Sequence, residues 1–90
     1  MKVFKLKHIP TGLFYTPSKG SGNLSKTGKI YSKKPDVKWA LVLRIKIFSF
    51  KQKPTNHHKT IVDYFGLDWR NGSIDTYVKT NYEDWEIVEL

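Results

Sequence analysis

The run GSGNLSKT at residues 20–27 has the residue types most able to do chemistry, because glycines, hydroxyls and a lysine suit phosphate binding. It approximates the phosphate-loop pattern G-x-x-x-x-G-K-[ST], in which backbone amides wrap a nucleotide's phosphates. Ser25 stands where the second glycine belongs, and Gly28 and Pro35 prevent the long helix that must follow. We therefore expect no nucleotide site. A solvated loop is the simplest interpretation, and contact with the phosphates of a polymer is the functional alternative.

The three histidines offer little for catalysis or metal binding. His8 lies where a predicted strand enters a turn, and the first acid in the chain is Asp36. His57 and His58 are adjacent, so in an extended chain they point to opposite sides, and no third ligand stands at a recognised spacing. The late carboxylates are scattered at strand-like spacing, as solvent-facing residues are, rather than clustered for a metal. We expect no catalytic residue, no metal site, no cofactor and no enzymatic activity.

Positive charge is the strongest chemical signal. The net charge is +8, yet residues 1–59 hold 14 of the 16 Lys and Arg against one acid, for +13, whereas residues 60–90 carry −5. The acidic third could fold back and neutralise part of the basic surface. Because the excess still remains large, we expect attraction to a polyanion.

Aromatic residues are interleaved with these cations, which is typical of nucleic-acid-binding surfaces. Lysines act as point charges and suit phosphates better than base edges, so we expect low sequence specificity. The candidate nucleic-acid-binding residues are cations for the phosphates and two tyrosines as stacking platforms: Lys5, Lys7, Lys26, Lys29, Lys33, Lys34, Arg44, Lys46, Tyr15 and Tyr31.

Length and composition limit the class of protein. Ninety residues with 39% hydrophobic side chains predict a single domain over residues 1–90 with one modest core. The absence of cysteine excludes disulfides and thiolate metal sites. No apolar run approaches a membrane span and no signal peptide is recognisable, so we expect a soluble intracellular protein without a membrane partner.

The cations must be positioned by short strands. Pro10-Thr11-Gly12 is a turn signal between two alternating runs, 3–8 and 13–16, which predict a hairpin. Residues 18–23 contain no apolar side chain, so we expect a solvated loop there. Residues 29–33 predict a third strand that Pro35 stops.

The later elements follow from the same signals. Residues 38–50 predict a strand at the centre of the sheet, and its start is open because Pro35-Asp36 could first begin a short helical turn through Trp39 to Leu41. Arg44 and Lys46 share one face of this strand, and Lys5 and Lys7 are candidates for that same face. Residues 51–59 predict a loop, and residues 60–66 suit a strand slightly better than a helix. Asn71-Gly72 predicts a second hairpin between 67–69 and 74–78, and residues 85–90 a paired final strand. We expect a mainly β domain of five to seven strands, barrel-like or strongly curved, with at most one short helix.

Three segments together, HIPTGLFYTP at 8–17, NLSKTGKIYSKKP at 23–35 and DWEIVEL at 84–90, resemble small accessory proteins of T-even-like tailed bacteriophages. The resemblance covers roughly residues 4–35 and 82–90. It implies expression in the cytoplasm of the infected bacterial host and interaction with nucleic acid or with a host protein. It transfers no active-site residue.

The leading expectation is therefore a small basic phage accessory protein that binds DNA or RNA through backbone phosphates. One alternative is a host-directed inhibitor or adaptor that docks on the acidic surface of a host protein, in a defence system or the transcription machinery. A minor virion component is the other. The basic first part and the acidic last part could also pair head to tail in a homo-oligomer.

Overall fold

The computed structural model describes residues 2–18, 21–48, 56–68 and 73–90. These residues form one α-helix, α1 (Asn56–Phe65), and two short 3-10 helices, η1 (Val37–Ala40) and η2 (Tyr82–Asp84). Their strands are β1 (Phe4–His8), β2 (Leu13–Ser18), β3 (Ser21–Ser25), β4 (Val42–Phe48), β5 (Ser73–Lys79) and β6 (Trp85–Glu89). The predicted class, mainly β with one short helix, is confirmed. No helix in the described ranges is long and apolar enough to cross a membrane.

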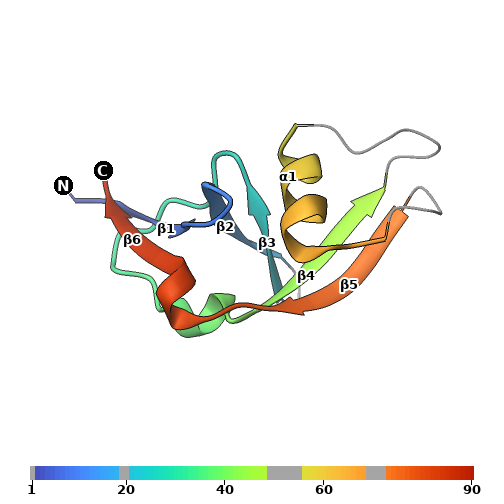
Figure 1. Ribbon diagram of the computed structural model, residues 1–90. Helices are drawn as coiled ribbons and strands as arrows, with labels where there is room; N and C mark the ends of the chain where they lie inside the picture. The colour runs from blue at the N-terminus through green and yellow to red at the C-terminus, as the bar shows by residue number, and fades with distance from the viewer. Residues whose placement is uncertain (1, 19–20, 49–55, 69–72) are drawn as a thin grey trace.

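The described strands make one curved sheet in the order β5-β4-β3-β2-β1-β6 (Figure 1). Only the β3–β4 pair is parallel among these, and the sheet ends at β5 and β6, so it is open rather than a closed barrel. The final strand pairs with β1, as predicted. The central position predicted for β4 is wrong, because β2 and β3 take the centre and β4 lies second from an edge.

The first hairpin confirms the turn chemistry of the sequence. β1 and β2 pair with His8 opposite Leu13, and the Gly12 amide donates to the His8 carbonyl at 2.8 Å. Gly12 has a φ of 71°, a conformation that costs glycine little.

The loop predicted at residues 18–23 is wrong where the structure describes it, since Ser21–Ser25 form β3 and Ser18 ends β2. A strand needs backbone groups rather than apolar side chains to pair, and β3 pairs with β2 and β4 at once. Gly22 is buried against the Tyr15 ring, where a Cβ would collide with it. The small side chains that suggested a loop are what this close approach requires.

The third strand predicted at residues 29–33 is also wrong. The segment makes a single bridge, in which Tyr31 and Phe4 exchange two backbone hydrogen bonds of 2.8 Å. Gly28, with a φ of 68°, turns the chain so that the Lys29 amide donates to the Tyr15 carbonyl at 3.1 Å. The segment thus fills the space where β1 and β2 separate, since these two strands pair only near the turn.

Residues 56–65 form α1, so the slight preference for a strand at 60–66 is wrong, and the predicted loop at 51–59 gives way to helix from Asn56. Ile61, Val62 and Phe65 fall on one helical face and pack on the core. Gly66, at a φ of 63°, ends the helix, and the Leu67 amide donates to the Val62 carbonyl at 3.0 Å. Asn71-Gly72 lies outside the described residues, and the part of 67–69 that is described, Leu67 and Asp68, is not strand.

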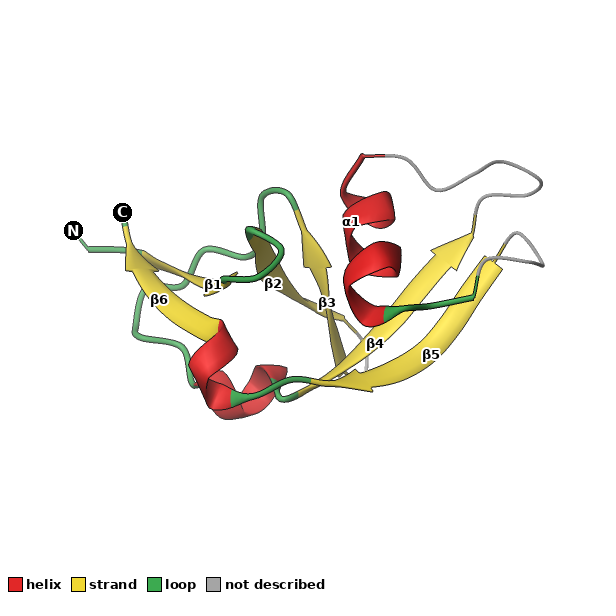
Figure 2. Ribbon diagram, in the orientation of Figure 1, coloured by secondary structure: helices red, strands yellow, loops and turns green. Residues whose placement is uncertain are grey.

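A buried hydrogen-bond chain links the segments that enter β4 and β6. The Trp85 Nε1 donates to the Thr80 hydroxyl at 2.9 Å, and that hydroxyl donates to the Ala40 carbonyl at 2.7 Å. Figure 2 shows η1 and η2 side by side at this place. The helical turn predicted after Pro35 is confirmed as η1, capped by Asp36, whose carboxylate accepts from the Lys38 amide at 2.9 Å.

The core lies between α1 and one face of the sheet, which we call the inner face. Every strand contributes alternate side chains to it, as the period of two requires. The buried residues of this core are Leu6, Leu13, Tyr15, Leu24, Ala40, Leu43, Ile45, Ile47, Ile61, Val62, Ile74 and Trp85. The intervening side chains of the strands therefore share the opposite face of the sheet.

Candidate nucleic-acid interface

The opposite face, called here the outer face, carries cations, aromatics and small polar residues. It consists of Lys5 and Lys7 of β1, Phe14, Thr16 and Ser18 of β2, Asn23 and Ser25 of β3, Val42, Arg44, Lys46 and Phe48 of β4, Ser73, Asp75, Tyr77 and Lys79 of β5, and Glu86 and Val88 of β6. Five of these side chains are cationic and two are acidic, so the face has a net positive charge.

Strand register sets the spacing of the cations. Lys7 lies opposite Phe14 and Phe14 opposite Ser25, while Gly22 of β3 pairs with Leu43 of β4. The cations of β1 and β4 therefore lie on either side of β2 and β3. The polar residues of β2 and β3 fill the interval.

That interval contains a groove of about 410 Å³, called the outer groove, lined by Thr16, Ser18, Asn23, Arg44 and Lys46. Its lining offers hydroxyls, an amide and two cations, which are donors suited to phosphate oxygens. The Thr16 and Ser25 hydroxyls are 2.6 Å apart, and Ser25 also accepts from the Gly28 amide at 2.8 Å. This hydrogen bonding holds the β2–β3 floor of the groove in place.

Three aromatic rings share the outer face with the cations. Phe48 is 57% exposed and Tyr77 is 64% exposed, while Phe14 is half-buried. A cation lies over each ring: Lys5 Nζ is 5.0 Å from the centroid of Phe14, Lys46 Nζ 5.3 Å from that of Phe48, and Arg44 Cζ 5.8 Å from that of Tyr77. Single exposed aromatics are ordinary, but two exposed rings and a half-buried one on a single cationic sheet face form a surface that can stack bases and hold phosphates together.

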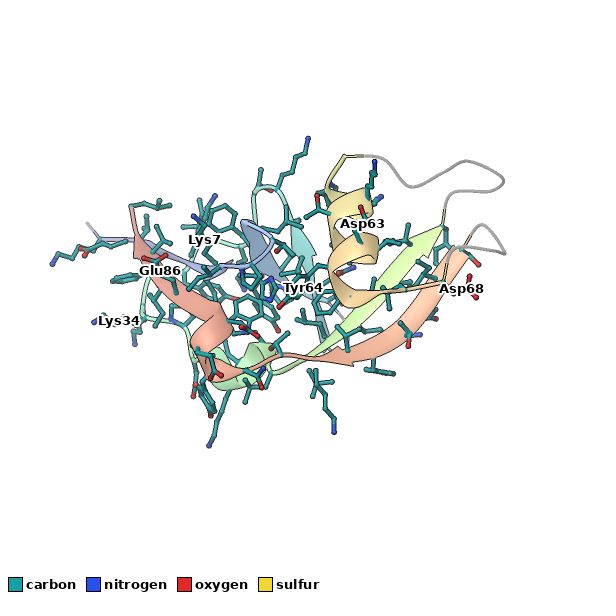
Figure 3. The ribbon with its side chains drawn as sticks, viewed as in Figure 1. Lys7, Lys34, Asp63, Tyr64, Asp68 and Glu86 are labelled. Carbon is teal, nitrogen blue, oxygen red and sulfur yellow. The ribbon has the colours of Figure 1, made fainter. Side chains whose placement is uncertain are left out.

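Two acidic residues, Asp75 and Glu86, reduce the positive charge of the outer face. Arg44 donates two hydrogen bonds of 2.9 Å to Asp75. These hydrogen bonds are the main reason why the pKa of the Asp75 carboxyl is lowered and that of Arg44 is raised. The pair therefore stays ionised at neutral pH. Glu86 lies opposite Lys7 in the β1–β6 register, and Figure 3 shows the two labelled side chains at the same end of the sheet.

Four of the predicted site residues meet on the outer face: Lys5, Lys7, Arg44 and Lys46. The other predicted cations, Lys26, Lys29, Lys33 and Lys34, are exposed in the segment between β3 and η1. Lys26 approaches α1 closely enough to contribute to the lowered pKa of His57, and Figure 3 places Lys34 at the end of the molecule that holds the termini. The structure thus divides the predicted cations between two surfaces.

The two tyrosines predicted as stacking platforms are not on the outer face, and the burial of Tyr15 rules out that role for Tyr15. Tyr15 is only 5% exposed and contacts Trp85 edge-on at 6.3 Å in the core. Tyr31 is half-buried, packs against Trp39 at 5.8 Å and carries Lys29 Nζ 5.3 Å from its centroid. Desolvation by burial raises the pKa of both phenols, and the charge of Tyr15 adds to the shift of Tyr31. The exposed rings of the outer face are Phe48 and Tyr77. The alternation of Phe48 with Arg44 and Lys46 was the signal in the sequence that could have identified Phe48.

His8 is a core residue with no exposed surface. Its Nδ1 lies 2.8 Å from the Thr11 hydroxyl, and its ring lies 5.3 Å from that of Tyr64, 5.9 Å from that of Phe65 and 4.9 Å from that of Trp85. Its Nε2 is buried without a hydrogen-bond partner among the described residues. Burial lowers the pKa of His8 from its ordinary 6.5, and the Asp84 carboxylate opposes that shift.

His57 and His58 lie in the first turn of α1, with ring centroids 4.2 Å apart, rather than on opposite sides of an extended chain. Burial lowers the pKa of His57, and the charges of His58 and Lys26 add to the effect. Among the residues that the structure describes, no group of three His, Cys, Asp or Glu side chains could hold a metal ion.

Acidification should destabilise the protein through these histidines. Because the folded pKa values of His8 and His57 are lowered, the unfolded chain binds protons more readily, and stability is lost as the pH falls below about 6.5. Each histidine contributes a slope of at most about 1.4 kcal/mol per pH unit. Urea unfolding between about pH 6.5 and 5 should show a shallower slope in His8→Gln and in His57→Gln than in the wild type. Equal slopes in all three proteins would contradict this assignment.

Comparison of the chain with protein-family models, with curated proteins and with solved structures finds no match, so the outer face is interpreted from its own residues.

Proposed function

We propose that the protein binds nucleic acid through the outer face, mainly by contacts to backbone phosphates and with little sequence preference. The observation that carries the proposal is the convergence of Lys5, Lys7, Arg44 and Lys46 around a polar groove on one sheet face with exposed aromatic rings. The resemblance to phage accessory proteins suggests that this binding serves the phage in the cytoplasm of an infected bacterium.

The charge pattern supports phosphate binding over base reading. Lysine presents a compact charge on a flexible stem and lacks the planar fork with which arginine reads guanine. Lys5, Lys7 and Lys46 form no ion pair with another described residue, whereas Arg44 is held by Asp75. We therefore expect three to four phosphate contacts, made without a preferred base.

Salt dependence tests the proposal directly. Three to four phosphate contacts on a single strand should release counterions so that affinity falls about 20- to 50-fold between 50 and 200 mM salt. Fluorescence anisotropy of a labelled oligonucleotide, titrated with the full chain at several salt concentrations, measures this slope. Absence of binding at about 50 mM salt, or an affinity that does not change with salt concentration, would rule out the proposed function.

A further inference from the structure

We infer that the preferred ligand is single-stranded nucleic acid, with bases stacked on Phe48 and Tyr77 and the backbone in the outer groove. This inference rests on the proposed function and adds the class of ligand to it. It depends on where the two rings lie relative to the cations of β4, on their exposure, and on the shape of the surface that carries them.

The two rings flank the cations of β4 on different sides. Tyr77 lies opposite Arg44 in the β4–β5 register, and Phe48 follows Lys46 by two residues on the same face. Four residues of strand separate the Phe48 and Arg44 positions, about 13 Å, and Lys46 lies between them. A strand of nucleic acid crossing this region would therefore meet a ring, a cation and a second ring in turn.

The exposure of these rings favours unpaired bases. More than half of each side chain is accessible, and burial of that area by a base would be favourable. In a duplex the base faces are already stacked on one another, so a ring on a protein surface cannot reach them without unstacking. In a single strand every base offers a face, whatever its identity, which agrees with low sequence specificity.

The cations over the rings do not prevent stacking. Lys46 Nζ and Arg44 Cζ lie 5.3 and 5.8 Å from the centroids, close to the outer limit of about 6 Å for a cation–π contact. At a solvent-exposed site such contacts are weak, and lysine has a flexible stem. A phosphate in the outer groove would draw Lys46 toward itself and leave the face of Phe48 open to the adjacent base.

The broad sheet surface of the outer face also favours a single strand over a duplex. Specific readers of duplex DNA insert a helix or a two-stranded ribbon into the major groove. Here the cations and rings belong to β1, β2, β4 and β5 of one sheet, and α1 packs on the inner face. A broad sheet surface can bear a flexible strand along its length.

The test compares a single strand of about 20 thymidines with a duplex of the same length at about 50 mM salt, by anisotropy with the full chain. We expect the single strand to bind at least about tenfold more tightly. Phe48→Ala and Tyr77→Ala should each weaken single-strand binding by about tenfold and leave duplex binding and the salt slope nearly unchanged. Tyr77→Phe should bind like the wild type, because stacking needs the ring and not the hydroxyl.

Tyr82→Ala is the matched control, since Tyr82 is 55% exposed but lies on η2. It should bind both ligands normally. Equal affinity for duplex and single strand, or normal single-strand binding by both alanine variants, would overturn the inference while nucleic-acid binding stands. Failure of the wild type to bind either oligonucleotide, as expected if the face docks on an acidic protein, would overturn the proposed function as well. Circular dichroism of each variant verifies that its fold is intact.

Discussion

Exchanging Lys5, Lys7 and Lys46 together for glutamine is expected to weaken single-strand binding by about 100-fold at 100 mM salt. Each phosphate contact releases about 0.7 counterion from a single strand, so each lost contact costs about fivefold at that salt. The slope of log affinity against log salt should become shallower by about 2. Glutamine keeps much of the aliphatic stem that the half-buried Lys5 and Lys7 lay on the sheet, so the fold should be little affected. Anisotropy at several salt concentrations measures both quantities.

The matched control removes the same charge elsewhere. Lys29, Lys33 and Lys34 are exposed in the segment between β3 and η1, and their joint exchange for glutamine should reduce affinity only a few-fold through the screened long-range field. Equal losses from the two triple variants would show that net charge, rather than the outer face, drives binding.

Asp75→Asn should act in the opposite direction and tighten binding by about fivefold, because it releases Arg44 from its ion pair.

Gly22→Ala is expected to destabilise the fold by about 3 kcal/mol, which lowers the midpoint of thermal unfolding by about 12 °C or more. A Cβ at Gly22 would overlap the Tyr15 ring, and that ring is held in the core between β3 and Trp85. The ring cannot swing away without displacing its neighbours, because interiors are close-packed. Urea unfolding followed by tryptophan fluorescence measures the loss.

Comparison of Gly66→Ala with Gly22→Ala distinguishes destabilisation by backbone strain from destabilisation by steric crowding. Gly66 has a φ of 63° and open space around it, so alanine there should cost only the left-handed conformation, about 1 to 2 kcal/mol. Gly22 has no positive φ, and its cost is steric alone. Tyr15→Leu combined with Gly22→Ala should therefore be less destabilised than the sum of the two single variants. Strict additivity of the two changes would refute the packing explanation.

Local signals predicted several elements correctly. Pro10-Thr11-Gly12 predicted the first hairpin because proline fixes its own φ and glycine accepts a positive φ, whatever the rest of the chain does. Asp36 predicted the start of η1 because a cap acts over two or three residues. The alternation in residues 43–48 predicted β4 and the shared face of Arg44 and Lys46, since successive side chains of a strand point to opposite faces.

The errors share one physical cause, which is that pairing partners far apart in sequence decided the outcome. β3 is a strand because its backbone pairs with β2 along its length and with β4 at Gly22, although its side chains resemble those of a loop. The run around Ile61 and Val62 suits a helix or a strand, and packing on the inner face selects the helix. Tyr15 and Phe14 are both aromatic, and only the sheet register sends Tyr15 inward and Phe14 outward.

The amino-acid sequence was enough to predict the mainly β class, the excess of positive charge in residues 1–59 and the faces on which neighbouring cations lie. These properties depend on composition and on a period of two residues, which are local. Which cations share a surface depends on the tertiary structure, because the sheet order places Lys5 and Lys7 of β1 on the same face as Arg44 and Lys46 of β4, with β2 and β3 between them. The same folding left Lys29, Lys33 and Lys34 outside the sheet and gave the outer face Phe48 and Tyr77 in place of Tyr15 and Tyr31.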